Sequence, residues 1–156
     1  MSARIVIAIS AFLFAGALLA EGSDKPCSAN LNSSIAAEQI AGAKCAAEKG
    51  ADDYSAELIS LVSSNSPDEV RLEAAYALST LKDDSRKDQA VSSLLEVAKN
   101  SKSVVMQYAA ALTLHVLVEK GDDRGAEVTA LMSDLSDSRD ELLADLTTKL
   151  ASARSK

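Results

Sequence analysis

The side chains most able to do chemistry are a single histidine, two cysteines and three pairs of aspartates. To act as a catalytic base, His115 would need a nucleophile and an orienting carboxylate, and the sequence marks neither. A half-buried structural role is the better interpretation of His115, so we expect no enzymatic activity. A function as an enzyme or a lyase accessory is the weaker alternative, because convergent acid–base groups are lacking.

The aspartate pairs, at positions 52–53, 83–84 and 122–123, each precede a segment with helical periodicity. Calcium is abundant outside cells, but these pairs lack the D-x-D-x-D-G spacing that brings several oxygens onto one ion. Acidic residues near helix N-termini complement the helix dipole, which is the simpler interpretation. We expect neither a metal ion nor an organic cofactor.

Cys27 and Cys45 are the only cysteines. If the chain enters an oxidising compartment, we expect them to form a disulfide that ties the polar N-terminal stretch to the first helix. Two free thiols are the alternative. A metal site made of two cysteines and one histidine would be short of ligands.

The first twenty residues follow the order of a secretory signal peptide. Arg4 is their only charge, residues 5–19 form an apolar run, and small residues come next. Cleavage after Ala17 and cleavage after Ala20 both fit the pattern. An uncleaved anchor is the alternative, but the run is shorter than the ~20 residues that a spanning helix needs. We expect a secreted or periplasmic protein that is not associated with a membrane after cleavage.

The composition narrows the classes of partner. The chain has 156 residues and a net charge of −7, which disfavours nucleic acid and anionic membrane surfaces. There is no tryptophan, and both phenylalanines lie within the first twenty residues. The core must therefore be aliphatic and rich in alanine. The oligomeric state stays open.

Residues 21–33 are polar and predict an irregular arm, in which Asn32 begins a glycosylation acceptor that matters only in a eukaryotic secretory pathway. Residues 34–153 form the predicted helical domain, and no segment alternates with the period of a strand. The 3.6-residue period predicts about seven helices, at residues 34–49, 56–63, 66–81, 86–99, 103–120, 124–135 and from 138 onward.

Capping patterns support these boundaries. Ser66 is expected to cap the third helix, with Pro67 in its first turn and Glu69 reaching back to the cap. Ser85 with Asp88, and Ser138 with Glu141, repeat the capping-box spacing. Gly50 and Gly121 are expected to end helices in a left-handed conformation.

The helices pair as a shorter one, a polar turn and a longer one, and the pattern repeats after about 35 residues. A shift of 35 aligns Val70 with Val105, whereas a shift of 36 aligns Leu78 with Leu114. In the helix at 103–120, Val105, Ala109, Leu112 and Val116 fall on one stripe, with Met106, Ala110, Thr113 and Leu117 beside it. A repeat of this length is typical of helical solenoids.

Residues 68–78 read DEVRLEAAYAL, which resembles the second helix of a HEAT repeat, with its pattern acidic-x-V-R-x-x-A-A-x-A-L, and of the phycobilisome-lyase-type HEAT-like repeats. The second unit keeps Val105, Ala109 and Ala110 but has Met106 at the arginine position, and the third keeps only caps and leucines. The resemblance implies a short right-handed α-solenoid of antiparallel helix pairs that binds proteins. It also implies that Arg71 makes a structural bond between repeats, with an aspartate as its partner.

In such a stack the longer helices usually line the concave face. Tyr76 and Tyr108 lie on two of them, and His115 shares a stripe with Tyr108. Because exposed tyrosines are favoured in interfaces, the candidate partner-binding residues are Tyr76, Tyr108, His115 and Glu73. The alternative is that both tyrosines only pack against neighbouring helices.

The function that these patterns favour is an exported, non-enzymatic protein–protein interaction module or scaffold, with another protein as its partner. The alternative is a helical carrier that holds a small apolar ligand in a groove between helix pairs.

Overall fold

The computed structural model describes residues 26–119 and 122–155. Over these ranges the chain is all-helical and contains no strand, which confirms the predicted class. The predicted signal peptide and both of its cleavage sites lie outside the described residues. The elements are α1 Ser28–Leu31, α2 Ala36–Lys49, a 3-10 turn Ala51–Tyr54, α3 Ser55–Ser63, α4 Asp68–Leu78, α5 Asp84–Asn100, α6 Val104–Leu117, α7 Gly125–Ser136 and α8 Glu141–Ser155.

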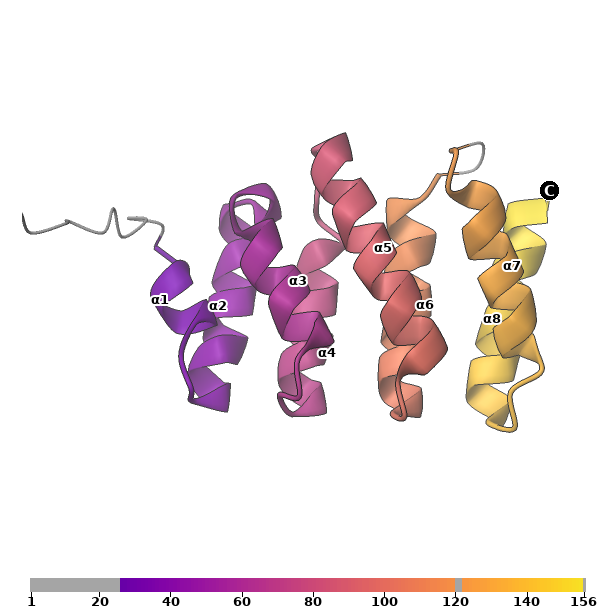
Figure 1. Cartoon of the computed structure of the whole chain (residues 1–156), viewed down its shortest axis with the longest axis horizontal. Helices are drawn as coiled ribbons and strands as arrows, with labels where there is room; N and C mark the ends of the chain where they lie inside the picture. Colours follow the sequence, from indigo (N-terminus) through magenta and orange to yellow (C-terminus); the bar gives the residue numbers. More distant parts are fainter. Residues whose placement is uncertain (1–25, 120–121, 156) are drawn as a thin grey trace, which may run out of the picture.

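The helices lie in two rows (Figure 1). Helices α3, α5 and α7 form the nearer row, and α4, α6 and α8 lie behind them. Each nearer helix packs against the next helix in the chain, so α3 contacts α4, α5 contacts α6 and α7 contacts α8. Contacts also run along each row, from α2 through α4 and α6 to α8, and from α3 through α5 to α7.

The core between the rows combines leucines with small alanines. Leu58, Leu78, Leu94 and Leu114 are fully buried, and so are Ala74 and other alanines of α2, α4, α5 and α6. Small side chains let helix backbones approach closely, and leucines fill the space that remains. This alanine-rich core agrees with the composition, although it also contains Tyr54, which is buried.

The predicted capping box of α4 is wrong. Pro67, with φ −51° and ψ 147°, occupies the cap position, and no side chain caps this helix. The extended ψ of Pro67 places it before the helix and not in its first turn. The Ser66 hydroxyl instead lies 3.5 Å from Oε1 of Gln39 in α2.

Two other predicted caps are also displaced. Asp83, and not Ser85, caps α5, since its carboxylate accepts a hydrogen bond from the Arg86 amide. At α8 the Asp140 carboxylate accepts from the Leu143 amide at 2.9 Å, where Ser138 was expected. In both places an aspartate at the correct distance from the helix takes the position predicted for a serine.

The ends of α2 and α6 also differ from the predicted ones. Gly50 ends α2 with φ +121°, a positive value that favours glycine, although its ψ of 105° is not the expected left-handed conformation. Helix α6 ends at Leu117, earlier than predicted, because Val118 is extended. The Val118 carbonyl accepts a hydrogen bond from Arg154 of α8 at 2.6 Å. Gly121 lies outside the described residues.

The N-terminal arm is not wholly irregular. Cys27 and Cys45 form the predicted disulfide, which joins the start of α1 to α2. Leu31 of α1 is buried, and Gly42 of α2 lies so close that an added Cβ would come within 2.6 Å of the Leu31 nitrogen. The disulfide and this close contact explain a helix of one turn that sequence periodicity did not predict.

The repeat has a uniform shift of 36 in this part of the chain. Val70 is fully buried, and its counterpart in α6 is the fully buried Met106, whereas Val105 is half exposed. The alignment of Val70 with Val105 was therefore one residue out of register. The position of Arg71 then corresponds to Gln107 and not to Met106.

Candidate partner-binding groove

One side of α6 exposes a continuous apolar stripe. Val105, Tyr108, Leu112 and Val116 have exposed fractions of 50, 38, 38 and 59%. Their spacings of three and four residues place them on one face of the helix. The buried face of α6 carries Met106, Ala110, Thr113 and Leu117, the second of the two rows in the sequence pattern. Contiguous exposed apolar surface is characteristic of interaction sites, whereas single scattered apolar residues are ordinary on a protein surface.

Helix α4 supplies the other wall. Tyr76, with an exposed fraction of 62%, and the partly buried Leu72 face the same space as the stripe of α6. The two helices enclose a shallow groove with a volume of about 440 Å³, which we call the α4–α6 groove. Its lining residues are Leu72, Ala75, Tyr76, Ser79, Tyr108, Ala109, Leu112, Thr113 and Val116.

The two aliphatic hydroxyls of this groove, those of Thr113 and Ser79, are used within the protein. The Thr113 hydroxyl donates to the Ala109 carbonyl at 2.9 Å and lies 3.3 Å from the Ala75 carbonyl, so it links α6 to α4. The Ser79 hydroxyl donates to the Tyr76 carbonyl at 2.6 Å. No hydrogen bond within the described ranges engages the hydroxyls of Tyr76 and Tyr108. The groove therefore presents apolar surface with two phenols at its walls.

The candidate residues from the sequence separate into two groups. Tyr76 and Tyr108 come together in the α4–α6 groove, as a shared binding surface requires. Glu73 is partly buried on α4 and lies beside Tyr76 in helical spacing, but does not line the groove. His115 is also outside it and partly buried, with a buried Nδ1 that has no hydrogen-bond partner in the described structure.

Sequence reasoning missed Leu72, Leu112 and Val116 as groove residues. The sequence pattern puts Leu112 and Val116 on one of two adjacent apolar stripes and does not show which stripe faces outward. One signal was present, because residues 104–117 contain no aspartate, glutamate, lysine or arginine. A helix at a protein surface without any such residue indicates that its outer face serves something other than solvation.

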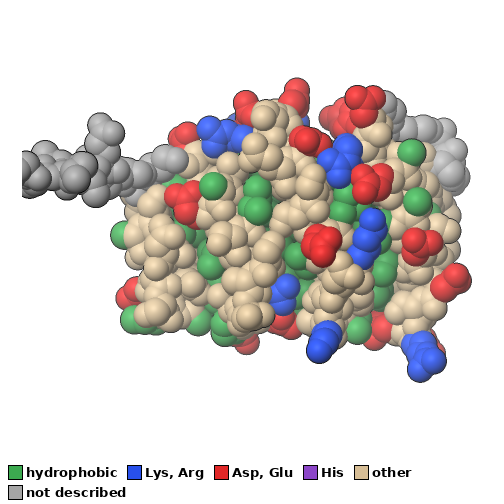
Figure 2. All heavy atoms as spheres, in the orientation of Figure 1, with side chains coloured by type: hydrophobic (Ala, Val, Ile, Leu, Met, Phe, Trp, Pro, Cys, Tyr) green, Lys and Arg blue, Asp and Glu red, His purple; other side chains and the backbone are tan. Residues whose placement is uncertain are grey.

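The opposite row of helices looks different. On the face formed by α3, α5 and α7, acidic and basic side chains are scattered and the apolar side chains show as small separate areas (Figure 2). Many of these charges pair: Arg124 contacts Asp88 at 2.6 Å and Glu127 at 2.9 Å. This face has the character of an ordinary solvated surface.

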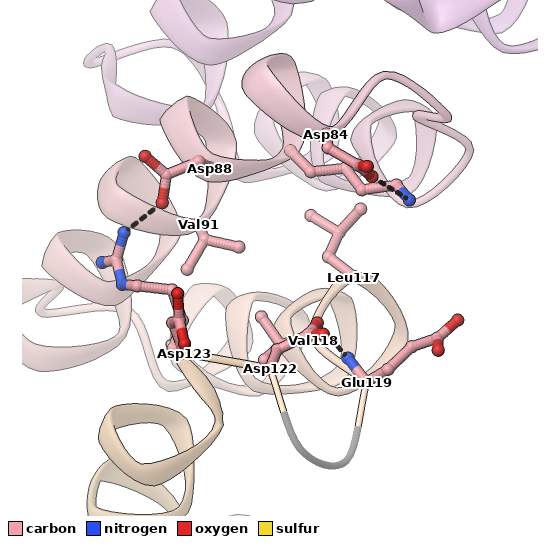
Figure 3. Close-up of a pocket in the computed structure, with 10 residues that line it drawn as sticks. Asp84, Asp88, Val91, Leu117, Val118, Glu119, Asp122 and Asp123 are labelled. Carbon is pink, nitrogen blue, oxygen red and sulfur yellow. Dashed lines mark hydrogen bonds and ion pairs between the residues drawn. The ribbon is translucent and has the colours of Figure 1, made fainter.

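A second hollow, between α5 and the segment that joins α6 to α7, is acidic (Figure 3). It has a volume of about 420 Å³, and its carboxylates come from Asp84, Asp88, Glu119, Asp122 and Asp123. Several have structural partners: Lys87 pairs with Asp84, Arg124 pairs with Asp88, and the Asp122 carboxylate accepts from the Glu119 amide at 2.8 Å.

The charges around that hollow stabilise each other. Partial burial lowers the pKa of Arg124, but hydrogen bonds and charge attraction from Asp88 and Glu127 outweigh it and raise the pKa above its ordinary value. In the described parts of the chain, no group of three or more His, Cys, Asp or Glu side chains could hold a metal ion. Asp83 and Asp122 accept hydrogen bonds from backbone amides, and Asp84 pairs with a lysine.

None of the described helices has both the length and the hydropathy that a membrane span requires. In comparisons with known proteins, no family model matches the chain, and neither a curated protein nor a solved structure matches it. The feature of the structure that bears on function is therefore the α4–α6 groove.

Proposed function

We propose that the chain is an exported, non-enzymatic interaction module, and that its α4–α6 groove binds another protein. The observation that carries this proposal is the exposed apolar stripe of α6, which faces Tyr76 and Leu72 across the groove. Leaving these side chains in water forgoes roughly 25 cal/mol for each Å² that a partner could cover. Tyrosine is also a favoured contact residue in interfaces.

The proposed architecture is a short right-handed α-solenoid of antiparallel, HEAT-like helix pairs. The contacts within each pair and along each row support it, as does the shift of 36 that relates α3 and α4 to α5 and α6. Export is supported by the signal-peptide pattern and by the Cys27–Cys45 disulfide, since such bonds persist in oxidising compartments.

Site-specific photo-crosslinking in the native host tests this function. A photoreactive residue at Leu112 samples the groove, and one at Gln89, exposed on α5, samples the opposite row. We expect a crosslinked protein from position 112 and none of the same mass from position 89. Equal yields from both positions, or none from position 112, would refute the assignment of the groove.

The second candidate function, a carrier of a small apolar ligand, is favoured by the size of the groove. A volume of about 440 Å³ falls in the range of small-molecule sites, and the lining is apolar. Native mass spectrometry of protein purified from its own host decides between the two. A small molecule that copurifies with the wild-type protein but not with Leu112→Asp would support the carrier. If the wild-type protein retains no small molecule, the interaction module is supported instead.

A further inference from the structure

The α4–α6 groove has features that specify what kind of protein segment fits it. The α6 residues that line the groove run from Tyr108 to Val116, which is about 12 Å of helix at a rise of 1.5 Å per residue. A helical segment with anchors at i, i+3 or i+4, and i+7 needs only about 10 Å of groove. The groove is therefore long enough for two turns of a bound helix.

The hydrogen-bonding state of the groove disfavours an extended segment. The backbone of an extended peptide would bring N–H and C=O groups that need partners, and each unpaired one is costly in an apolar site. The hydroxyls of Thr113 and Ser79 already donate to carbonyls of α6 and α4. The described residues also offer no strand edge. A helix satisfies its own backbone and so avoids this cost.

The charges along the groove are one-sided. Helix α6 has no formal charge, whereas α4 carries Glu69 and Glu73, which neighbour Leu72 and Tyr76 in helical spacing. In the described structure neither glutamate makes a hydrogen bond or an ion pair, whereas Asp68 on the same helix pairs with Arg71. The apolar floor is thus flanked on the α4 side by two unpaired carboxylates.

These observations lead to one occupant. We propose that the α4–α6 groove holds an amphipathic α-helix of a partner protein, with apolar anchors on one face and Lys or Arg along the edge that faces α4. This inference rests on the proposed function and specifies its partner. The basic edge offsets Glu69 and Glu73, and the phenols of Tyr76 and Tyr108 lie where they can bond polar groups of the partner.

The same charges disfavour the other occupants. A second copy of this chain would bring the same stripe, which contains no lysine or arginine, together with two more glutamates. An anionic membrane would be repelled by these carboxylates and by the net charge of −7.

The test uses protein purified from its own host and three synthetic helical peptides. The first has leucine anchors with lysine edges, the second has the same anchors with glutamate edges, and the third has lysine edges with scrambled anchors. We expect the first to bind about tenfold tighter than the second at low salt. In the double variant E69Q/E73Q the ratio should fall to about twofold, and Leu112→Asp should abolish binding of the first peptide.

Equal affinity of the lysine and glutamate peptides, or an unchanged ratio in the double variant, would overturn the proposal. Binding of the scrambled peptide as tightly as the first would overturn it too. Groove-dependent binding to phosphatidylcholine vesicles, or groove-dependent dimerisation in sedimentation, would assign another occupant.

Val116→Asp provides a second groove variant in case Leu112→Asp does not fold, since Val116 is the more exposed residue. The proposed function and the proposed kind of partner can fail separately. If the crosslink from position 112 forms but the lysine peptide has no advantage, only the basic amphipathic helix is wrong. If no crosslink forms there, the proposed function itself fails.

Discussion

Arg71 and Gln107 make the same hydrogen bond in successive units of the fold. Nε of Arg71 donates to the Val62 carbonyl at 2.9 Å, and Nε2 of Gln107 donates to the Ala98 carbonyl at 3.2 Å. Both donors and both acceptors differ by 36 residues. Each bond joins the second helix of a unit to a carbonyl near the end of the first, so it fixes how the two helices meet.

The first prediction concerns these two bonds. Arg71→Ala and Gln107→Ala should each lower the free energy of unfolding by about 1–2 kcal/mol, because a part-buried carbonyl loses its donor. Arg71→Gln should retain most of the stability, since glutamine makes the bond in the second unit. Urea unfolding measures all three variants. The shared role would be wrong if Arg71→Gln were as unstable as Arg71→Ala.

The second prediction concerns the disulfide. Replacing Cys27 and Cys45 with serine should lower the free energy of unfolding by about 3 kcal/mol in the chain-entropy model. Reduction of the wild-type protein should cause a loss of similar size, whereas the double variant should not respond to reductant. Thermal unfolding with and without dithiothreitol measures both. An unchanged melting temperature after complete reduction would contradict a stabilising bond.

The third prediction is that replacing one helical glycine with alanine destabilises the protein, which is the reverse of the usual effect. In a helix, Gly→Ala normally stabilises by up to about 1 kcal/mol. At Gly42 the added Cβ would come within 2.6 Å of the Leu31 nitrogen, which belongs to the backbone of α1. We therefore expect Gly42→Ala to destabilise by about 1–3 kcal/mol. Lys44→Ala, exposed on the same helix, is the control and should change stability by less than about 0.5 kcal/mol. A stabilised Gly42→Ala would show that α1 does not pack this closely.

The fourth prediction concerns pH. Partial burial raises the pKa of Asp52, but hydrogen bonds from the backbone amides of Asp83 and Lys82, aided by the Arg86 and Lys82 charges, lower it overall below its ordinary 3.8. A carboxyl with a lowered pKa in the folded state stabilises the fold above its unfolded pKa. This stability is lost as the pH falls through the folded pKa.

Asp52→Asn should therefore be less stable than wild type by about 1 kcal/mol at neutral pH. The gap should narrow as the pH falls below about 4, where the wild-type carboxyl takes up its proton. Urea unfolding between pH 2.5 and 7 measures the gap, with Asp134→Asn on an exposed part of α7 as the control. A gap that stays constant over this range would contradict the role of Asp52.

How far the sequence predicts this fold is clearest at α6. The period of apolar residues identifies the helix, but two adjacent rows on it are both apolar, one from Val105 to Val116 and one from Met106 to Leu117. When a helix is apolar on most sides, its sequence lacks the contrast between a polar and an apolar face that would show which row is buried. Only the packing of α4, α5 and α8 against α6 decides that Met106 faces inward and Leu112 outward.

The other predictions also succeeded where sequence pattern decides the structure and failed where packing or a single backbone angle decides it. The disulfide follows from cysteine count and the signal-peptide pattern, and the all-helical class follows from periodicity. The start of α4 depends on the ψ of one residue, Pro67, which propensity does not determine. Helix α1 is too short for a period to be seen, and its position depends on the bond between Cys27 and Cys45. Of the candidate site, Tyr76 and Tyr108 were predictable because tyrosine is a favoured contact residue, whereas the aliphatic lining looked like core.

Binding of a partner protein in the α4–α6 groove can be checked by measuring one affinity in the wild type and two variants. The protein that crosslinks to position 112 is identified, and its Kd is measured for wild type, Leu112→Asp and Gln89→Asp. We expect Leu112→Asp to weaken binding by about 30-fold or more, the size expected at the centre of an interface, and Gln89→Asp to change it within about twofold. Equal affinities of the two variants for that partner would contradict binding in this groove.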